Sequence, residues 1–161
     1  MTSEKVPYIC GPLTELPPDQ QEAVKGFYAR LADLCQEVLG ARAFVPHEHF
    51  DPIKHADIPS RQVDAGERRQ VCELCSLLIV VAIAPSWGGG IEVEMANRSD
   101  VPVIVLVPSG KRVSRLLLGN PAVMNCIEYA SNHEAMERLR PQLIGLLVRG
   151  SAPLDPDLCD P

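Results

Sequence analysis

Apolar residues occur along this chain both in short continuous runs and in longer periodic stretches. Runs at residues 6–10, 77–84 and 103–107 are apolar without alternation, which predicts strands that are covered on both faces of a parallel sheet. A shorter run at residues 43–45 predicts a further strand, and residues 126–129 predict an edge strand. About five strands are therefore expected.

Between these runs, apolar side chains recur every three or four positions, which is the period of an amphipathic helix. In the first such stretch Asp19 is the expected N-cap, and Gly40 is expected to end the helix. Ser60 is the expected cap of a second helix that runs to about residue 75. Short helices are predicted over residues 91–98 and 113–118.

The last helix has a clear start signal. Ser131 and Glu134 have the spacing of a capping box, and Pro141 is expected to kink the helix that follows. Residues 150–161 are rich in proline and acidic residues, which predicts a disordered tail after a single domain over residues 1–149.

Strands that alternate with helices predict an α/β fold with a mainly parallel sheet. We expect a single-domain, Rossmann-like (flavodoxin-like) fold of three layers. Ligands of such folds bind at the carboxyl ends of the strands. Three predicted loops lie there, at residues 11–16, 85–90 and 108–114.

Composition and charge narrow the function. The chain has 161 residues and a net charge of −6, which disfavours binding to a nucleic-acid polymer or a membrane surface. No apolar run approaches the length of a membrane span and the N-terminal residues do not resemble a signal peptide, so we expect a cytoplasmic protein.

The six cysteines are expected to be reduced thiols in that compartment. Cys72 and Cys75 have the C-x-x-C spacing, but no second such pair is present and the histidines lack zinc-site spacing. We interpret this pair as structural and expect neither a metal nor a cofactor.

The most informative segment is the glycine-rich loop that follows the strand at residues 77–84. Its three glycines allow a ligand to approach the backbone, and the helix that follows offers free N–H groups to an anion. Glu92 lies in the first turns of that helix. It is either a catalytic carboxylate beside an anion site or a residue that complements the helix dipole.

Three motifs carry a family resemblance. They are Tyr-Ile-Cys-Gly at residues 8–11, Pro-Ser-Trp-Gly-Gly-Gly-Ile-Glu-Val at residues 85–93, and Ser-Gly-Lys-Arg-Val-Ser at residues 109–114. In order and approximate spacing over residues 6–120, the chain resembles the nucleoside 2-deoxyribosyltransferase superfamily, and in particular the 2'-deoxynucleoside 5'-phosphate N-hydrolases.

The resemblance implies a role for each matching residue. Glu92 matches the nucleophile that forms a glycosyl-enzyme intermediate, and Tyr8 matches the tyrosine that orients it. The resemblance also implies a homodimer in which each subunit contributes to its neighbour's site. The implied 5'-phosphate pocket comprises Gly11, Ser86, Gly88 and Gly90, together with Ser114 from the partner subunit.

Some positions depart from the family pattern. The family usually carries an aspartate on the helix before the nucleophile, but an ungapped count places Arg68 there; a short gap would bring in Asp64, which we favour, or Glu67. Pro12 replaces a serine of the phosphate cradle, and Thr14 is a candidate to replace that hydroxyl.

A histidine and the tryptophan are further candidate substrate contacts. His47 or His49 would border the base pocket, since this loop does so in the family. Trp87 would either stack on a base or pack at a dimer interface.

The leading hypothesis is an N-glycosidase that converts a (deoxy)nucleoside 5'-monophosphate to free base and sugar 5-phosphate. One alternative is a nucleoside 2-deoxyribosyltransferase, a pentosyltransferase that would use the same Glu92 to exchange bases. The other is a non-catalytic nucleotide-binding or sensing module.

Overall fold

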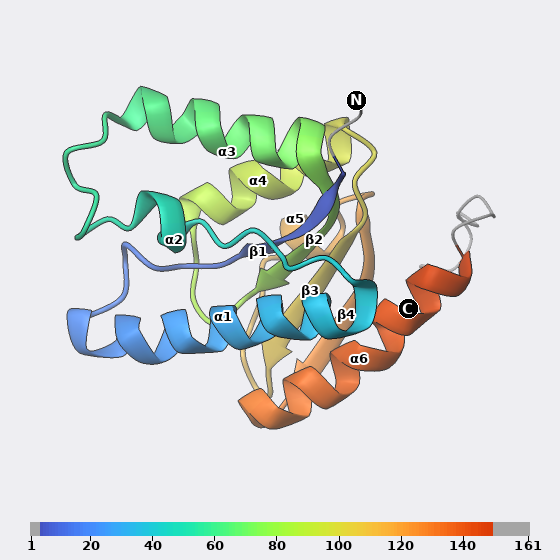
Figure 1. Ribbon diagram of the computed structural model, residues 1–161. Helices are drawn as coiled ribbons and strands as arrows, with labels where there is room; N and C mark the ends of the chain where they lie inside the picture. The colour runs from blue at the N-terminus through green and yellow to red at the C-terminus, as the bar shows by residue number, and fades with distance from the viewer. Residues whose placement is uncertain (1–3, 150–161) are drawn as a thin grey trace.

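The computed structural model describes residues 4–149 and has a four-stranded parallel sheet at its centre (Figure 1). The strands lie side by side in chain order, and each pairs in parallel with the next. They are β1 (Val6–Cys10), β2 (Cys75–Val81), β3 (Val103–Pro108) and β4 (Val123–Tyr129). The predicted α/β class with a parallel sheet is confirmed.

The fifth predicted strand, at residues 43–45, is reduced to one bridge. Phe44 pairs in parallel with Tyr8 on the outer side of β1: the Phe44 N–H donates a hydrogen bond to the Pro7 carbonyl, and the Phe44 carbonyl accepts one from the Ile9 N–H. With this bridge the order across the sheet is Phe44, β1, β2, β3, β4, which is the order of flavodoxin-like folds. The connections reverse direction between β1 and β2, so the crevice at the ends of these two strands is the expected ligand site.

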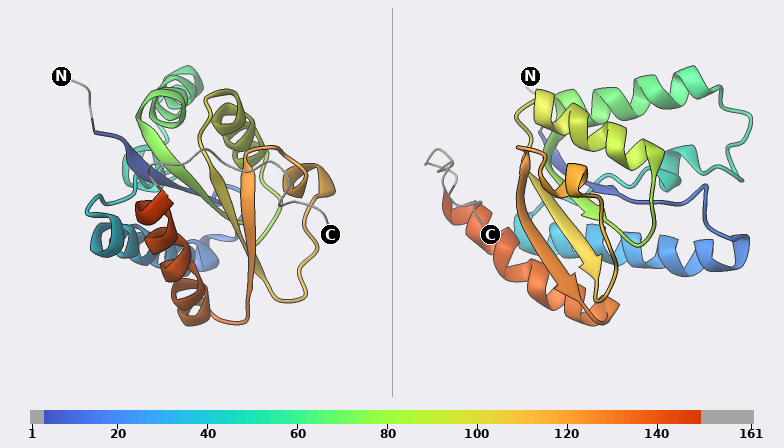
Figure 2. Two further views of the ribbon diagram at one scale, coloured as in Figure 1. Left: turned by 90° about the vertical axis from the view of Figure 1, so that its right-hand side faces the viewer. Right: turned by 180° about the vertical axis from the view of Figure 1, so that it is seen from behind.

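Six helices surround the sheet in the described part of the chain. They are α1 (Pro18–Leu39), α2 (His47–Phe50), α3 (Ser60–Leu74), α4 (Trp87–Arg98), α5 (Arg115–Leu118) and α6 (Asn132–Arg149). Helices α1 and α6 cover one face of the sheet, and α3, α4 and α5 cover the other (Figures 1 and 2). None of the described helices has the length and apolar character to cross a membrane.

Alternating strand residues explain why both faces are covered. Ile9, Ile79 and Ile104 pack against α1 and α6, whereas Tyr8, Leu78 and Val105 pack against α3 and α4. All six side chains are completely buried. A strand with apolar residues toward both faces is stable only between two helical layers, which accounts for the continuous apolar runs in the sequence.

Several helix starts differ from the prediction. Pro17 is the N-cap of α1 and Pro18 occupies its first turn, so Asp19 lies inside the helix and does not cap it. Helix α3 starts at Ser60 as expected, but the N-cap is Pro59 and no side chain caps this end. Proline is suited to these positions because its fixed φ fits a helix start and its missing N–H needs no partner.

The last helix follows its sequence signal. The Ser131 hydroxyl accepts a hydrogen bond from the Glu134 N–H at 3.1 Å, and the Glu134 carboxylate accepts one from the Ala130 N–H at 2.7 Å. The helix continues through Pro141 to Arg149. The predicted disordered tail, residues 150–161, lies outside the described residues.

Candidate active site

Glu92 and Tyr8 form a buried pair below the crevice between β1 and β2. Helix α4 starts at Trp87, four residues earlier than predicted, because the Ser86 hydroxyl caps it by accepting the Gly89 N–H at 3.1 Å. Glu92 therefore lies in the second turn of α4, over the strands, with 6% of its surface exposed. The hydroxyl of Tyr8, on β1, donates a hydrogen bond to Oε1 of Glu92.

The protonation of this pair follows from its burial. Burial raises the pKa of Glu92, while hydrogen bonds from the Cys10 thiol and the Tyr8 hydroxyl oppose that rise. Burial and the nearby Glu92 carboxylate raise the pKa of Tyr8 well above its usual range. Tyr8 thus stays a hydrogen-bond donor at neutral pH and holds the Glu92 carboxylate in one orientation.

A cavity of about 360 Å³, hereafter the Glu92 cavity, opens above this carboxylate. Its walls come from the loop after β1, from α1, from the segment around α2, from α3 and from the start of α4. The lining includes Gly11, Thr14, Tyr28, His47, Phe50 and Trp87. This is the crevice that the order of the strands predicts for a ligand.

A second carboxyl group, Glu67 on α3, lines the same cavity. Burial, and the negative charges of Glu92 and Asp64, raise the pKa of Glu67 to about 7. A carboxyl group with such a pKa can hold a proton at neutral pH and still release it. Two carboxyl groups in one cavity with different surroundings are the usual basis for separate acid and nucleophile roles.

Asp64, which the sequence analysis favoured as the second acid, does not line this cavity. Its side chain is exposed and forms an ion pair with Arg68, one helical turn further along α3, at 2.9 Å. Val63 and Glu67, four positions apart on α3, both line the cavity, whereas Asp64 lies about 100° further around the helix than Val63 and is exposed. The geometry therefore favours Glu67 over Asp64.

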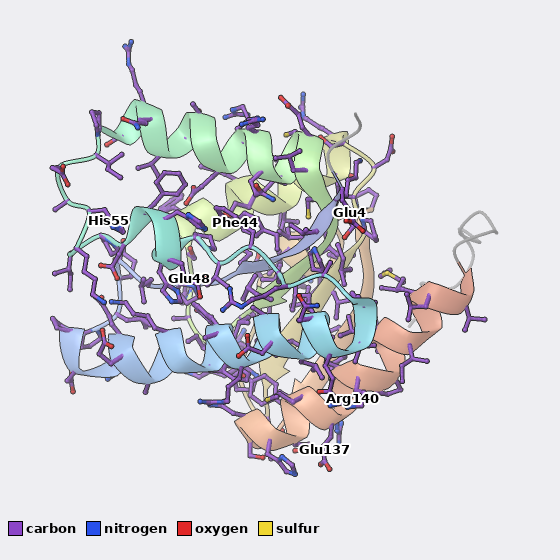
Figure 3. All side chains as sticks on the ribbon, in the orientation of Figure 1. Glu4, Phe44, Glu48, His55, Glu137 and Arg140 are labelled. Carbon is purple, nitrogen blue, oxygen red and sulfur yellow. The ribbon has the colours of Figure 1, made fainter. Side chains whose placement is uncertain are left out.

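The structure separates the two candidate histidines. His47 lines the Glu92 cavity, burial lowers its pKa, and its buried Nδ1 has no hydrogen-bond partner among the described residues. His49 instead stacks on Phe44 with ring centroids 4.4 Å apart, and it lines a separate cavity beside Glu4 and Glu48. Figure 3 labels Phe44, Glu4 and Glu48. His47 is thus the histidine that a ligand in the Glu92 cavity would meet.

Gly11 is required by a close approach between the loop after β1 and α1. A Cβ at this position would overlap the hydroxyl of Tyr28, which donates a hydrogen bond to the Pro12 carbonyl at 2.8 Å. Tyr28 lines the cavity but was missed in the sequence. Its place on the apolar face of α1, one turn after Val24, is the signal that could have indicated burial.

The glycine-rich turn faces two cavities. Ser86 and Gly89 line the Glu92 cavity and also a second one of about 840 Å³, whereas Gly88 lines only the first and Gly90 only the second. A Cβ at Gly88 or Gly90 would meet no other atom, so both positions leave open space beside the backbone. Trp87 is 88% exposed, at the mouth of the Glu92 cavity.

Ser114 lies apart from Glu92 within one chain. Together with Lys111 and Arg112 it lines the second cavity, hereafter the Ser114 cavity. Gly11 lines both cavities as well, so the two are neighbours across the turn that joins β2 to α4. No lysine or arginine of the described residues lines the Glu92 cavity.

The cysteines of residues 4–149 are all free thiols, and Cys75 is buried at the start of β2. Within the same residues, no three histidine, cysteine, aspartate or glutamate side chains are arranged to hold a metal ion.

Comparisons with known proteins support the fold. No protein-family model matches the chain, and no curated protein matches its sequence. A solved structure of the CMP N-glycosidase BcmB from Clostridium botulinum is similar with a TM-score of 0.62 at 18% identity, over 84% of this chain and 98% of that one. A conserved protein from Enterococcus faecalis V583 is similar with a TM-score of 0.63 at 14% identity, over 87% of this chain and 99% of that one.

At these identities the likeness is one of fold. The chain shares the α/β fold of the CMP N-glycosidase structure.

Proposed function

We propose that the protein is an N-glycosidase that hydrolyses (deoxy)nucleoside 5'-monophosphates to free base and sugar 5-phosphate. The observation that carries the proposal is the buried Glu92 carboxylate, which is held by Tyr8 in a cavity that also contains the second acid Glu67. The fold that the chain shares with a CMP N-glycosidase supports the same substrate class.

In the first step, a carboxylate oxygen of Glu92 attacks the anomeric carbon C1' of the sugar. The bond between C1' and the base nitrogen breaks, and its electron pair leaves with the base. Glu67 donates a proton to the departing base, for which a pKa of about 7 is suited near neutral pH. The products of this step are the free base and a glycosyl ester of Glu92.

In the second step, water attacks C1' of that ester from the side the base has vacated. The Glu67 carboxylate, now ionised, takes a proton from the water, and Glu92 leaves as a carboxylate. Each proton that Glu67 gives in the first step is thus regained in the second. The Tyr8 hydroxyl keeps Glu92 oriented through both steps because its own proton is not released.

The 5'-phosphate is proposed to bind at the N-terminus of α4. Backbone N–H groups at a helix start attract an anion, and the space beside Gly88 allows a phosphate to come close. Thr14 and Ser86 line the same cavity and supply hydroxyl groups. Held at this end, the sugar would lie over Glu92.

A homodimer would complete the site. Within residues 4–149, no lysine or arginine lines the Glu92 cavity, whereas Ser114, Lys111 and Arg112 line the neighbouring cavity. Large apolar side chains are exposed at Leu116 in that second cavity, at Trp87 beside the Glu92 cavity and at Ile91 on α4, as expected for a surface that packs against another subunit. The proposal is that Ser114 of the partner subunit reaches the phosphate.

The test is a substrate panel of nucleosides and their 5'-monophosphates, with and without an acceptor base, in which released base is measured by chromatography. Release from monophosphates alone, without an acceptor, supports the proposal. Release from nucleosides only with an acceptor would indicate a transferase, and binding without release a sensing module. Glu92→Gln should abolish release and still bind nucleotide.

A further inference from the structure

The loop between Phe44 and α3 covers the Glu92 cavity. Its first part, residues 46–52, is hereafter the roof segment and contains α2. Pro46, His47, Phe50 and Pro52 of this segment all line the cavity. Figure 1 shows α2 between the N-terminal halves of α1 and α3, beyond the ends of the strands. Contacts of Asp51 and Phe50 hold this segment to its two neighbouring helices.

A buried ion pair fixes the roof segment to α1. Lys25 Nζ on α1 lies 2.6 Å from Asp51 Oδ2, and the Asp51 side chain is 1% exposed. The other carboxylate oxygen, Asp51 Oδ1, accepts hydrogen bonds from the backbone N–H groups of Ile53 and Lys54 at 2.8 and 2.9 Å. Asp51 thus binds α1 with one oxygen and shapes the chain after α2 with the other.

The opposite side of the roof segment rests on α3, directly beside the proposed acid. A Cβ on Gly66 would overlap the ring of Phe50, so the glycine is what allows that ring to lie against the helix. The next residue is Glu67. Phe50 and Glu67 line the same cavity, together with Val63 one turn earlier on α3.

We propose that Lys25 and Asp51 are positioning residues that clamp the roof segment over the cavity, so that Phe50 shields Glu67 from water and the substrate is enclosed. The inference rests on the proposed function for the identity of the substrate. The clamp itself involves only α1, the roof segment and Glu67, so its effect on Glu67 can be measured in a protein that turns over no substrate.

The charges of Lys25 and Asp51 could instead act on Glu67 directly, but neither is among the groups that shift the pKa of Glu67. The groups that act on the pKa of Glu67 or share its cavity are Glu92 on α4, Asp64 on α3, Tyr8 and Cys10 on β1, His47 in the roof segment and Glu15 in the loop after β1. Burial is the largest cause of the raised pKa of Glu67. The clamp therefore reaches Glu67 by keeping water out.

Two variants distinguish loss of the clamp from loss of the folded structure. Lys25→Met leaves the Asp51 carboxylate buried without its partner, which is strongly destabilising in general. The double variant Lys25→Met/Asp51→Asn removes both charges, while an asparagine oxygen can still accept from Ile53 and Lys54, so it is the variant expected to fold. The matched control is Glu37→Gln, which breaks an exposed ion pair between Glu37 of α1 and Arg140 of α6.

The deciding measurement is the titration of the Glu67 carboxyl group by NMR, with ¹³C-labelled glutamate and assignment from the Glu67→Gln spectrum. We expect the apparent pKa of Glu67 to fall by about one unit or more in the folded double variant and to stay unchanged in Glu37→Gln. A folded double variant in which Glu67 titrates as in the wild type would overturn the clamp.

Two further readouts complete the test. In the wild type, amide hydrogen exchange at Ile53 and Lys54 should be as slow as in α3. Exchange at the rate of an open loop would contradict the clamp. This measurement needs no variant, so it does not depend on whether the variants fold. If base release is observed, the double variant should raise KM at least tenfold with a smaller change in kcat. If no protein releases base, the proposed function fails, while titration and exchange still decide on the clamp.

Discussion

The hydroxyl of Tyr8 on β1 donates a hydrogen bond to the Glu92 carboxylate on α4, although 84 positions separate the two residues in the chain. The bond links the strand to the helix that starts at the glycine-rich turn. It therefore sets the position of the proposed nucleophile relative to the cavity above the sheet. Both side chains are buried, so no water molecule can easily replace the tyrosine.

Tyr8→Phe tests this relationship. Hydrogen bonds to charged groups contribute about 1.5–3 kcal/mol, so we expect kcat to fall by about 10- to 100-fold with little change in overall fold. The Tyr8 bond lowers the pKa of Glu92, and its loss should raise that pKa further. The acidic limb of the pH–rate profile should then move to higher pH. A variant with unchanged kcat and an unmoved limb would contradict the orienting role.

Glu67→Gln tests the second acid. If Glu67 donates the proton to the leaving base, activity should decline in the wild type as pH rises through about 7, and this basic limb should be absent in the variant. The loss of rate should be smallest for bases that leave as stable anions, because they need no proton. The pH–rate profiles of both proteins give the measurement.

Asp64→Asn is the informative comparison for that experiment. Asp64 is exposed and paired with Arg68, so this variant should keep most of the turnover. Its removal takes away one negative charge that raises the pKa of Glu67, which should move the basic limb slightly to lower pH. If Asp64→Asn abolished base release and Glu67→Gln did not, Asp64 would be the acid.

The same pKa predicts a pH dependence of stability. The folded state raises the pKa of Glu67 above its usual value of about 4.5, so between pH 5 and 7 the folded state binds more protons there than the unfolded state. Stability from this group is therefore lost as pH rises through about 7, and because Glu67 is partly exposed, solvent screening reduces the size of this loss.

Urea unfolding at pH 5 and pH 8 measures this effect. The free energy of unfolding should change less between these two values in Glu67→Gln than in the wild type. His47 acts in the opposite sense, because burial lowers its pKa, and it is present in both proteins. The difference between the two slopes therefore isolates Glu67, and equal slopes would contradict its raised pKa.

Sequence reasoning was accurate where local pattern determines the outcome. The continuous apolar runs predicted the buried strands, and the Ser131–Glu134 spacing predicted the start of α6. The Tyr8 and Glu92 pair was foreseen only through the family resemblance, since no local pattern joins a strand residue to a helix residue so far along the chain. Neither residue carries a pairing signal of its own.

The sequence could not decide which side chains face the cavity. Asp64 and Glu67 are three positions apart on one helix, and the packing of α3 on the sheet turns only Glu67 inward. His47 and His49 are separated by the stacking of His49 on Phe44. The short strand at residues 43–45 is limited to one bridge, because the chain turns into α2 directly after Val45. Each outcome depends on tertiary contacts that the sequence does not display.

The shared site of the proposed dimer can be tested by complementation. Glu92→Ala and Ser114→Ala should each be nearly inactive alone. In a mixed dimer, the Ser114→Ala subunit supplies Glu92 while the other subunit supplies Ser114, so one of the two sites is intact. After unfolding and refolding an equal mixture, about a quarter of wild-type activity should appear, because half of the dimers are mixed and each has one working site.

The alternative is that Ser114 acts within its own chain. Ser114 and Glu92 line different cavities that share Gly11, Ser86 and Gly89, so a rearrangement of the turn between β2 and α4 would be needed to bring them together. In that case no mixed dimer contains an intact site, and the mixture should show no more activity than the separate variants. Light scattering on the same samples distinguishes this outcome from a failure to form dimers. The comparison is valid only if the refolded mixture has the mass of two chains.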